Sequence, residues 1–346
     1  MYTAAVVALL FAPQVPQVSQ VEPVLVREIG SADGTLDDAF VGVIDLAADE
    51  DGNLYILDDR ADRVRAFAPS GDHLRSFGRR GGDPGQLNRP MRLDVRNGIV
   101  TVLNPSGQAV SFTLAGDVVA SDPLPRGTQS ASRIDEGTYV LLSSGGIARE
   151  RPAPIESLLL VGPEAEDTAF TVPSSDILYR SPAATASVRT SLCRMAHFVV
   201  ATDGTLWVAS GIEGRLTDWG RIGGPLAPGR SVEVAAPGGP LPDTARAREF
   251  ARLPSQLDPA TGELYVPLIQ SSVCGLERST DGTLWVRLND VEGRERWTAV
   301  DAEAGAAIRE LVAPEGVTIS AFAGSLAFGI GRDDSGAPTV MMYRLE

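Results

Sequence analysis

The chain has 346 residues, of which 43% are hydrophobic, and this is enough to bury one large core. Its 30 basic and 45 acidic residues give a net charge of −15. Such an acidic surface repels phosphate groups, so we expect neither nucleic acid nor an anionic membrane as a partner. The 36 glycines and 24 prolines are scattered along the chain, a distribution that is typical of many short strands joined by turns.

The chain begins with a short apolar segment, residues 4–11, followed by a stretch rich in proline, glutamine and valine. The apolar segment is too short to span a bilayer, and its length suits the apolar region of an export signal. We therefore interpret residues 1–20 as an export signal, with a disordered apolar tail as the alternative. No later segment has the length and hydropathy of a membrane span, so we expect an exported protein, periplasmic or extracellular.

One phrase recurs along the chain: an acidic residue, a glycine, a small polar residue and an apolar strand. The clear copies are residues 51–56, 203–208 and 281–286, and weaker copies begin at Asn97, Glu136 and Gly324. Asp-Gly favours a tight turn because glycine tolerates the positive φ that hairpins require. The residues that follow are β-branched, aromatic or leucine, as buried strands prefer.

The spacing of these copies indicates the architecture. Their glycines lie 46, 39, 67, 78 and 42 residues apart, and three of these gaps match a propeller blade of about 40–50 residues. The two longer gaps then carry insertions. We place the insertion at residues 220–258, which are rich in proline, glycine and alanine, and expect loops there. A partial copy at residues 261–266 is either a seventh turn or a hairpin inside the insertion.

We therefore predict an all-β fold, a six-bladed β-propeller with four-stranded antiparallel blades, over residues 21–346. Blades packed face to face in a ring bury both faces of each sheet and shield the strand edges. The strand at residues 24–29 precedes the first turn and lacks a blade of its own. We expect it to pair with the final strand, residues 339–345, and to close the ring. A ring closed in this way is expected to be a monomer.

The first blade resembles NHL-repeat proteins. Residues 47–56 (Ala-x-Asp-x-Asp-Gly-Asn-Leu-Tyr-Ile) are similar to the first half of an NHL repeat, and residues 63–67 (Arg-Val-x-x-Phe) and 77–81 (Phe-Gly-x-x-Gly) to its second half. Residues 297–311 are similar to uncharacterised exported bacterial propellers with six blades. This resemblance implies the fold and not an activity, because propellers host unrelated functions.

Histidine is scarce, which limits the catalytic options. The resemblance to the NHL-type amidating lyase implies zinc held by several histidines, but this chain has only His73 and His197. His73 is expected to be solvated. His197 lies in the strand before the Asp203-Gly204 turn, and that inner strand lines the channel of a propeller. The resemblance to streptogramin-lyase-like propellers implies that a lone histidine there could act as a general base; a hydrogen-bonded structural histidine is the alternative.

Several arginines precede or begin the predicted inner strands. They are Arg89, Arg92, Arg133, Arg194 and Arg278. An arginine at the channel mouth can bind a carboxylate or phosphate through two parallel hydrogen bonds. The alternative for each is a surface position beside one of the many acids.

No resident cofactor is expected. Lactonase-like propellers hold Ca²⁺ in the channel on carboxylate and amide oxygens that converge from several blades. The candidates are Asp45, Asn88, Asp94 and Asn104. None of them stands in a distinctive sequence context, so channel calcium is the less favoured alternative.

The two cysteines occupy comparable positions, Cys193 lying 11 residues before Gly204 and Cys274 lying 8 residues before Gly282. If the two blades adjoin, a disulfide would link their inner strands near the channel. Two buried free thiols are the alternative.

These features favour an exported binding module that recognises a peptide, a glycan or a protein partner through one channel face, shaped by the insertion. The alternative is a hydrolase or lyase, streptogramin-lyase-like or lactonase-like, with a channel site near His197. Binding is favoured because the sequence alone does not assemble a convergent catalytic set.

Overall fold

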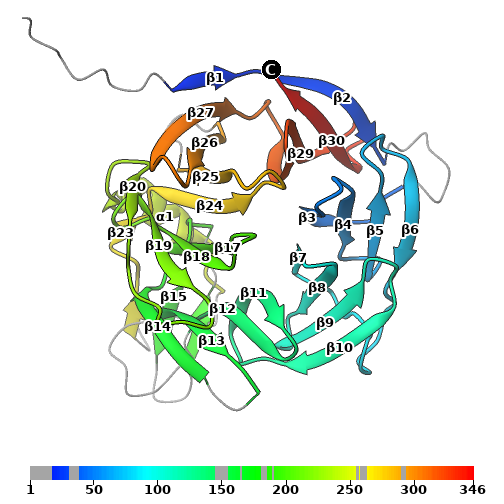
Figure 1. Cartoon of the computed structure of the whole chain (residues 1–346). Coiled ribbons are helices and arrows are strands. Elements are labelled where there is room, and N and C mark those ends of the chain that lie inside the picture. Colours follow the sequence, from blue (N-terminus) through cyan, green and yellow to red (C-terminus); the bar gives the residue numbers. More distant parts are fainter. Residues whose placement is uncertain are drawn as a thin grey trace, which may run out of the picture.

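The computed structural model confirms the six-bladed β-propeller (Figure 1). It describes residues 18–30, 39–144, 155–163, 166–180, 185–188, 191–254, 257, 263–289 and 294–346. Residues 1–17 of the expected export signal lie outside the described residues, whereas Ser19 and Gln20 already belong to a strand. No helix in the described ranges is long and apolar enough to cross a bilayer.

Each blade is an antiparallel sheet of four strands, ordered from the channel outwards. Blade one contains β3 (Val43–Ala48), β4 (Leu54–Asp58), β5 (Arg63–Phe67) and β6 (His73–Phe77). Blade two contains β7 (Arg92–Arg96), β8 (Ile99–Asn104), β9 (Gln108–Thr113) and β10 (Val118–Pro123). Blade three contains β11 (Thr128–Asp135), β12 (Thr138–Ser144), β13 (Ile155–Val161) and β14 (Glu166–Pro173).

The second half of the ring repeats this plan. Blade four contains β17 (Ala196–Val200), β18 (Thr205–Ser210), β19 (Arg215–Arg221) and β20 (Ser231–Glu233). Blade five contains β24 (Val273–Arg278), β25 (Leu284–Leu288), β26 (Arg296–Asp301) and β27 (Ala306–Val312). Blade six contains β28 (Thr318–Ala323), β29 (Leu326–Arg332), β30 (Pro338–Leu345) and β2 (Pro23–Ile29).

The recurring Asp-Gly phrase forms the turn between the first and second strands of a blade. Gly52, Gly204 and Gly282 have φ values of 80°, 88° and 86°, which only glycine adopts readily. Gly204 donates its N–H to the carbonyl of Ala201, and Gly282 does the same to Ser279. Each copy therefore follows an inner strand directly, which places the residues before it along the channel.

The chain termini close the ring, as predicted. Strand β2 pairs antiparallel with β30, so the N-terminal strand is the outer strand of blade six. Strand β1 (Ser19–Val21) adds a further contact, because it pairs in parallel with β27 at the edge of blade five. The N-terminal segment therefore spans the junction between blades five and six, at the top of Figure 1.

The hydrophobic core is divided among the interfaces between neighbouring blades. Between blades one and two, Tyr55 and Leu57 pack with Val100 and Val110. Between blades five and six, Trp285 packs with Phe322 and its neighbours. The apolar residues of each strand are thus shared by two sheets, and this explains why the ring rather than the single blade is the stable unit.

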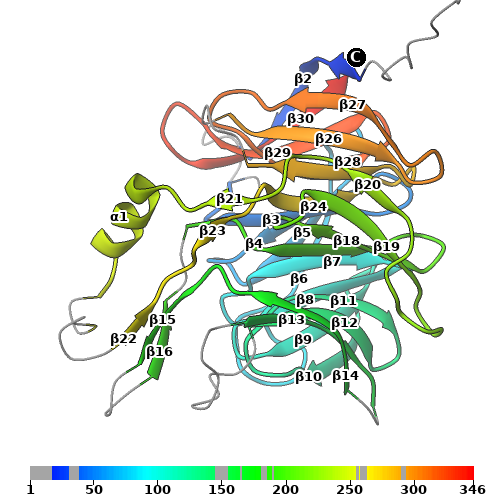
Figure 2. The same cartoon turned by 90° about the vertical axis from the view of Figure 1, so that its left-hand side faces the viewer.

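Two segments outside the blades form the insertion. The first, between β14 and β17, contains β15 (Ile177–Arg180) and β16 (Thr185–Val188). The second, between β20 and β24, contains β21 (Gly239–Pro240), α1 (Asp243–Ala251), β22 (Glu263–Tyr265) and β23 (Ile269–Gln270). Strand β15 pairs with β22, which joins the two segments. Figure 2 shows them projecting from one side of the ring.

The insertion lies partly within the expected residues 220–258, through β21 and α1, and partly outside them. Residues 220–233 complete blade four through the end of β19 and β20, and the remainder of 220–258 includes the helix α1 as well as loops. The partial copy at 261–266 supplies β22 to the insertion sheet.

Both segments connect an outer strand to the next inner strand. Because strands alternate in direction, all such connections lie on one face of the ring, together with the turns between second and third strands. We call this the insertion face.

Candidate functional site

The first strands of all six blades enclose a cavity of about 400 Å³ in the central channel. This volume lies within the range of small-molecule sites. The ionisable side chains on its wall are Asp45, Arg92, Asp94, Arg194, Arg96, His197, Glu277, Arg278 and Arg287. The cavity therefore combines cationic, acidic and imidazole groups in one enclosed space.

Strand β7 illustrates how the sequence directs such groups inwards. Side chains alternate between the two faces of a strand. Leu93 and Val95 pack against blade one in the core, so Arg92, Asp94 and Arg96 share the other face and line the channel.

Two carboxylates connect adjacent inner strands. Asp45 accepts hydrogen bonds from the backbone N–H of Leu93 at 2.9 Å and of Leu46 at 3.1 Å. Asp94 accepts one from the Ser132 hydroxyl at 2.7 Å. Burial raises the pKa of both carboxyls, and the Arg92 guanidinium opposes this for Asp45. These oxygens are thus largely engaged with the protein itself.

Glu277 and His197 come from the neighbouring inner strands β24 and β17. Burial, reinforced by the Asp45 carboxylate, raises the pKa of Glu277 well above its usual value. Burial, reinforced by the Arg194 and Arg287 guanidinium groups, lowers the pKa of His197 well below 6.5. The environment thus favours a neutral acid and a neutral imidazole. His197 Nε2 is buried without a hydrogen-bond partner among the described residues.

Replacing Glu277 with glutamine is expected to change how stability depends on pH. Because the folded-state pKa of Glu277 is raised, the folded protein binds more protons than the unfolded chain above about pH 4.5. The contribution of Glu277 to the free energy of unfolding therefore falls as the pH rises above about 4.5. We expect the free energy of unfolding of Glu277→Gln, relative to that of the wild type, to be higher at pH 8 than at pH 5. Urea unfolding at the two pH values measures this difference. An unchanged difference between the two proteins would contradict the assigned shift.

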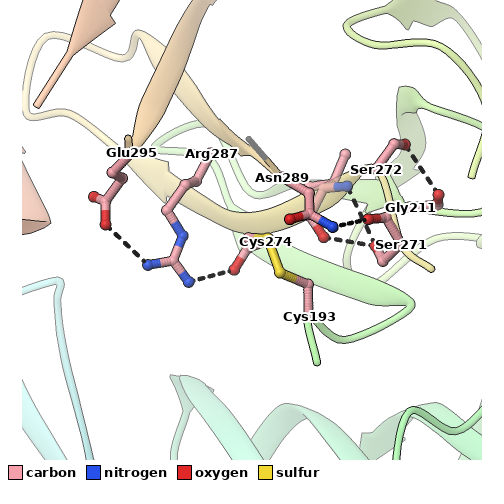
Figure 3. The surroundings of a disulfide bond; sticks show 9 residues. Cys193, Gly211, Ser271, Ser272, Cys274, Arg287, Asn289 and Glu295 are labelled. Carbon is pink, nitrogen blue, oxygen red and sulfur yellow. Dashed lines mark hydrogen bonds and ion pairs between the residues drawn. A yellow bond between two sulfur atoms is a disulfide. The ribbon is translucent and has the colours of Figure 1, made fainter. Parts of the chain in front are cut away.

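A disulfide joins Cys193 to Cys274, which lie 81 residues apart in sequence (Figure 3). It links the segment leading into β17 to the start of β24. Arg287 donates a hydrogen bond to the Cys274 carbonyl at 2.7 Å and another to Glu295 Oε2 at 3.4 Å. The disulfide and Arg287 thus fix the wall of the channel where blades four and five meet.

The candidate arginines have three different locations. Arg92, Arg194 and Arg278 line the channel cavity, and Arg194 lies 3.9 Å from the buried Glu156. Arg89 lines a second pocket on the insertion face. Arg133, on β11, lines neither cavity.

Arg96 and Arg287 are channel residues that the sequence reasoning missed. Arg96 could have been found from its alternation with Arg92 and Asp94. Arg287 lies on the second strand of its blade, opposite Gly275. A Cβ at Gly275 would lie 3.3 Å from Arg287 Nε, so the glycine leaves the space through which this arginine reaches the channel.

The end of the channel away from the insertion face is crossed by arginine side chains. Arg96, at the end of β7, donates hydrogen bonds to the carbonyls of Val200 at 2.6 Å and Ala201 at 3.1 Å. Arg278, at the end of β24, donates one to the Thr202 hydroxyl at 3.0 Å. These bonds connect blades two, four and five, so access to the cavity is expected from the insertion face.

Of the four candidate calcium ligands, only Asp45 and Asp94 line the channel. Asn104 accepts a hydrogen bond from the backbone N–H of Asn88 at 3.1 Å and donates one to the Gln86 carbonyl, so it has a structural role. Across the described ranges, no three His, Cys, Asp or Glu side chains are grouped closely enough to hold a metal ion.

The fold and channel define a six-bladed β-propeller, and a solved structure of similar fold supports this class. The protein BF0058 of Bacteroides fragilis, a proposed exported protein, matches with a TM-score of 0.57 and 12% identity over 96% of this chain and 97% of its own. Virginiamycin B lyase from Staphylococcus aureus matches with a TM-score of 0.42 and 10% identity, over 94% of this chain and 89% of its own.

A calcium-binding protein, regucalcin, from Agrobacterium tumefaciens matches with a TM-score of 0.44 and 12% identity, over 93% of this chain and 95% of its own. No protein-family model and no curated protein matches the chain. At these identities the likeness concerns the fold alone, and the resemblance to NHL repeats stays a prediction.

Proposed function

We propose that the protein is an exported binding module that takes a polar group of a peptide or glycan into its central channel from the insertion face. The observation that carries this proposal is the 400 Å³ cavity in which His197 Nε2 lacks a partner within the described structure. A buried polar group without a hydrogen bond costs about 1–3 kcal/mol, and a ligand that supplies the missing partner would recover this free energy.

The insertion supports the proposal because it is attached to the wall of the site. Glu249, a buried residue of α1, accepts a hydrogen bond from the backbone N–H of Ser191 at 3.1 Å and another from the Ser191 hydroxyl. Ser191 lies two residues before Cys193. The helix is therefore held against the segment that runs from Ser191 through the disulfide-bonded Cys193 to His197. This contact places the helix beside the channel mouth.

Replacing Glu277 with methionine is expected to abolish binding in the channel. Methionine has a similar length but offers no carboxyl group, so a polar ligand would lose the hydrogen bonds that this side chain can make inside the cavity. Saturation-transfer NMR with panels of short peptides and oligosaccharides measures this directly. The matched control is Glu303→Met in the exposed turn between β26 and β27, which should bind as the wild type does. Equal binding by the two variants would argue against the channel as the site.

A second function, lyase or hydrolase, is favoured by the opposite pKa shifts of His197 and Glu277. Both shifts favour the neutral form of the group, and a neutral imidazole and a protonated carboxyl on one cavity wall can divide the roles of base and acid. Here a neutral His197 would accept a proton and a protonated Glu277 would donate one.

His197→Ala tests this second function. If the protein is an enzyme, the variant should turn over lactone probes about 10²–10⁴-fold more slowly than the wild type. Its unfolding midpoint should be unchanged. Product formation by mass spectrometry is the measurement. Wild-type protein that turns over none of these probes would leave binding as the function.

Export is supported by the apolar segment near the N-terminus and by the disulfide, which persists in oxidising compartments. Sequencing the N-terminus of the protein recovered from the periplasm or medium would test it. A full-length N-terminus in the cytoplasm would contradict export.

A further inference from the structure

A second cavity, of about 390 Å³, opens on the insertion face between blades one and two. Its wall is formed by the apolar residues Ile44, Pro90, Met91 and Pro105, and by the polar residues Asp59, Asn88, Arg89 and Ser106. Ile44 also lines the channel cavity, so the two cavities share a wall. Ile44 is 39% exposed, and it lies at the boundary between the polar channel and a mainly apolar pocket.

The wall of this apolar pocket is held by specific bonds. Asp62 accepts a hydrogen bond from the backbone N–H of Arg89 at 2.6 Å, and Arg89 has a φ of 50°, which is uncommon for a residue other than glycine. The backbone N–H of Met91 donates to the Leu103 carbonyl at 2.8 Å. The link between blades one and two is therefore fixed in the shape that forms the pocket.

Arg92 follows the apolar pocket directly in the chain and faces the channel. Its hydrogen bond goes to the adjacent carbonyl of Met91 at 3.1 Å, and within the described part of the chain no carboxylate lies within 4.0 Å of its guanidinium. The nearby Asp45 has its oxygens on the backbone N–H groups of Leu46 and Leu93. Arg92 is thus a channel cation directly beside Met91 of the pocket. Its charge acts on the carboxyl groups of Asp45 and Glu277, and we expect its guanidinium to bind an incoming anion.

A carboxylate suits such an arginine, because the planar guanidinium matches it with two parallel hydrogen bonds. An apolar side chain suits the adjoining pocket, because burying it removes apolar surface from water. The C-terminal end of a peptide that contains an apolar residue carries both groups close together. A neutral glycan has neither group.

We propose that the ligand is a peptide C-terminus, with its carboxylate on Arg92 in the channel and an adjoining apolar side chain in the pocket of Ile44, Met91 and Pro105. This inference rests on the proposed binding function and specifies its ligand class. The insertion face would then bind the end of a polypeptide chain rather than the middle of a folded partner.

The test uses three acetylated tripeptides and isothermal titration calorimetry with the full chain. The probes are acetyl-Gly-Leu-Gly with a free carboxylate, the same peptide as its C-terminal amide, and acetyl-Gly-Ser-Gly with a free carboxylate. We expect the leucine acid to bind most tightly. The amide should bind about 10–100-fold more weakly, since a charge-assisted pair is lost, and the serine acid about 10-fold more weakly.

Two variants assign these losses to the two cavities. Arg92→Gln should weaken the leucine acid to the level of the amide, while Arg309→Gln, an exposed arginine on the outer strand β27, should leave binding unchanged. Ile44→Thr should weaken the leucine acid and leave the serine acid unaffected.

The possible failures are distinguishable. If oligosaccharides bind in a manner that Glu277→Met abolishes and no peptide does, the peptide assignment is overturned and channel binding stands. If peptide acids bind but Arg92→Gln has no effect, the assignment is also overturned. If no probe of either kind binds, both the channel function and the peptide assignment fail.

Discussion

Replacing Cys193 and Cys274 together with alanine is expected to lower the free energy of unfolding by about 4 kcal/mol. The disulfide closes a loop of 81 residues, and a crosslink of this length removes many conformations from the unfolded chain. The loop includes all of blade four and most of the insertion, so the effect should be seen in the unfolding of the whole ring. Urea unfolding followed by circular dichroism is the measurement.

Reduction provides the control for the cysteine variant. Wild-type protein unfolded in excess reductant should match the double alanine variant, whereas the variant itself should not respond to reductant. A decrease below about 1 kcal/mol would mean that the unfolded chain is already restricted by other contacts, and the entropic argument would fail for this pair.

The blades could be predicted from sequence because their signal is local. Asp-Gly turns specify a backbone conformation within four residues, and the apolar strand follows immediately. The insertion had only a weak signal of this kind, the partial copy of the phrase at residues 261–266. Its sheet forms where β15 meets β22, more than 80 residues later in the chain, and the β15 segment carries no motif that would indicate this partner. Composition marked residues 220–258, but composition does not reveal which strands pair across a long gap.

The candidate site could be predicted in part for the same reason. His197, Arg92 and Arg278 stand in strands that precede recognisable turns, so their place along the channel follows from the repeat. Glu277 stands in the same inner strand as Arg278, directly before it, so the same argument could have placed it along the channel. Arg287 was not, because its access to the channel depends on the missing side chain of Gly275 on the paired strand.

Trp285→Ala is expected to lower the free energy of unfolding by about 3–5 kcal/mol. Trp285 is 1% exposed and stacks on Phe322 of blade six with ring centroids 4.5 Å apart. Trp297 meets the same phenylalanine edge-on at 5.1 Å. Truncating Trp285 would leave a cavity between blades five and six, at the junction that the N-terminal strand also spans, so the ring would be weakened where it closes.

Trp285→Phe separates the contribution of packing from that of the indole N–H. The Nε1 atom of Trp285 is buried without a hydrogen-bond partner among the described residues, so phenylalanine removes an unpaired donor while it keeps an aromatic ring against Phe322. We expect phenylalanine to cost less than half as much as alanine in urea unfolding. Equal losses for the two variants would show that the size of the indole, rather than stacking on Phe322, holds the two blades together.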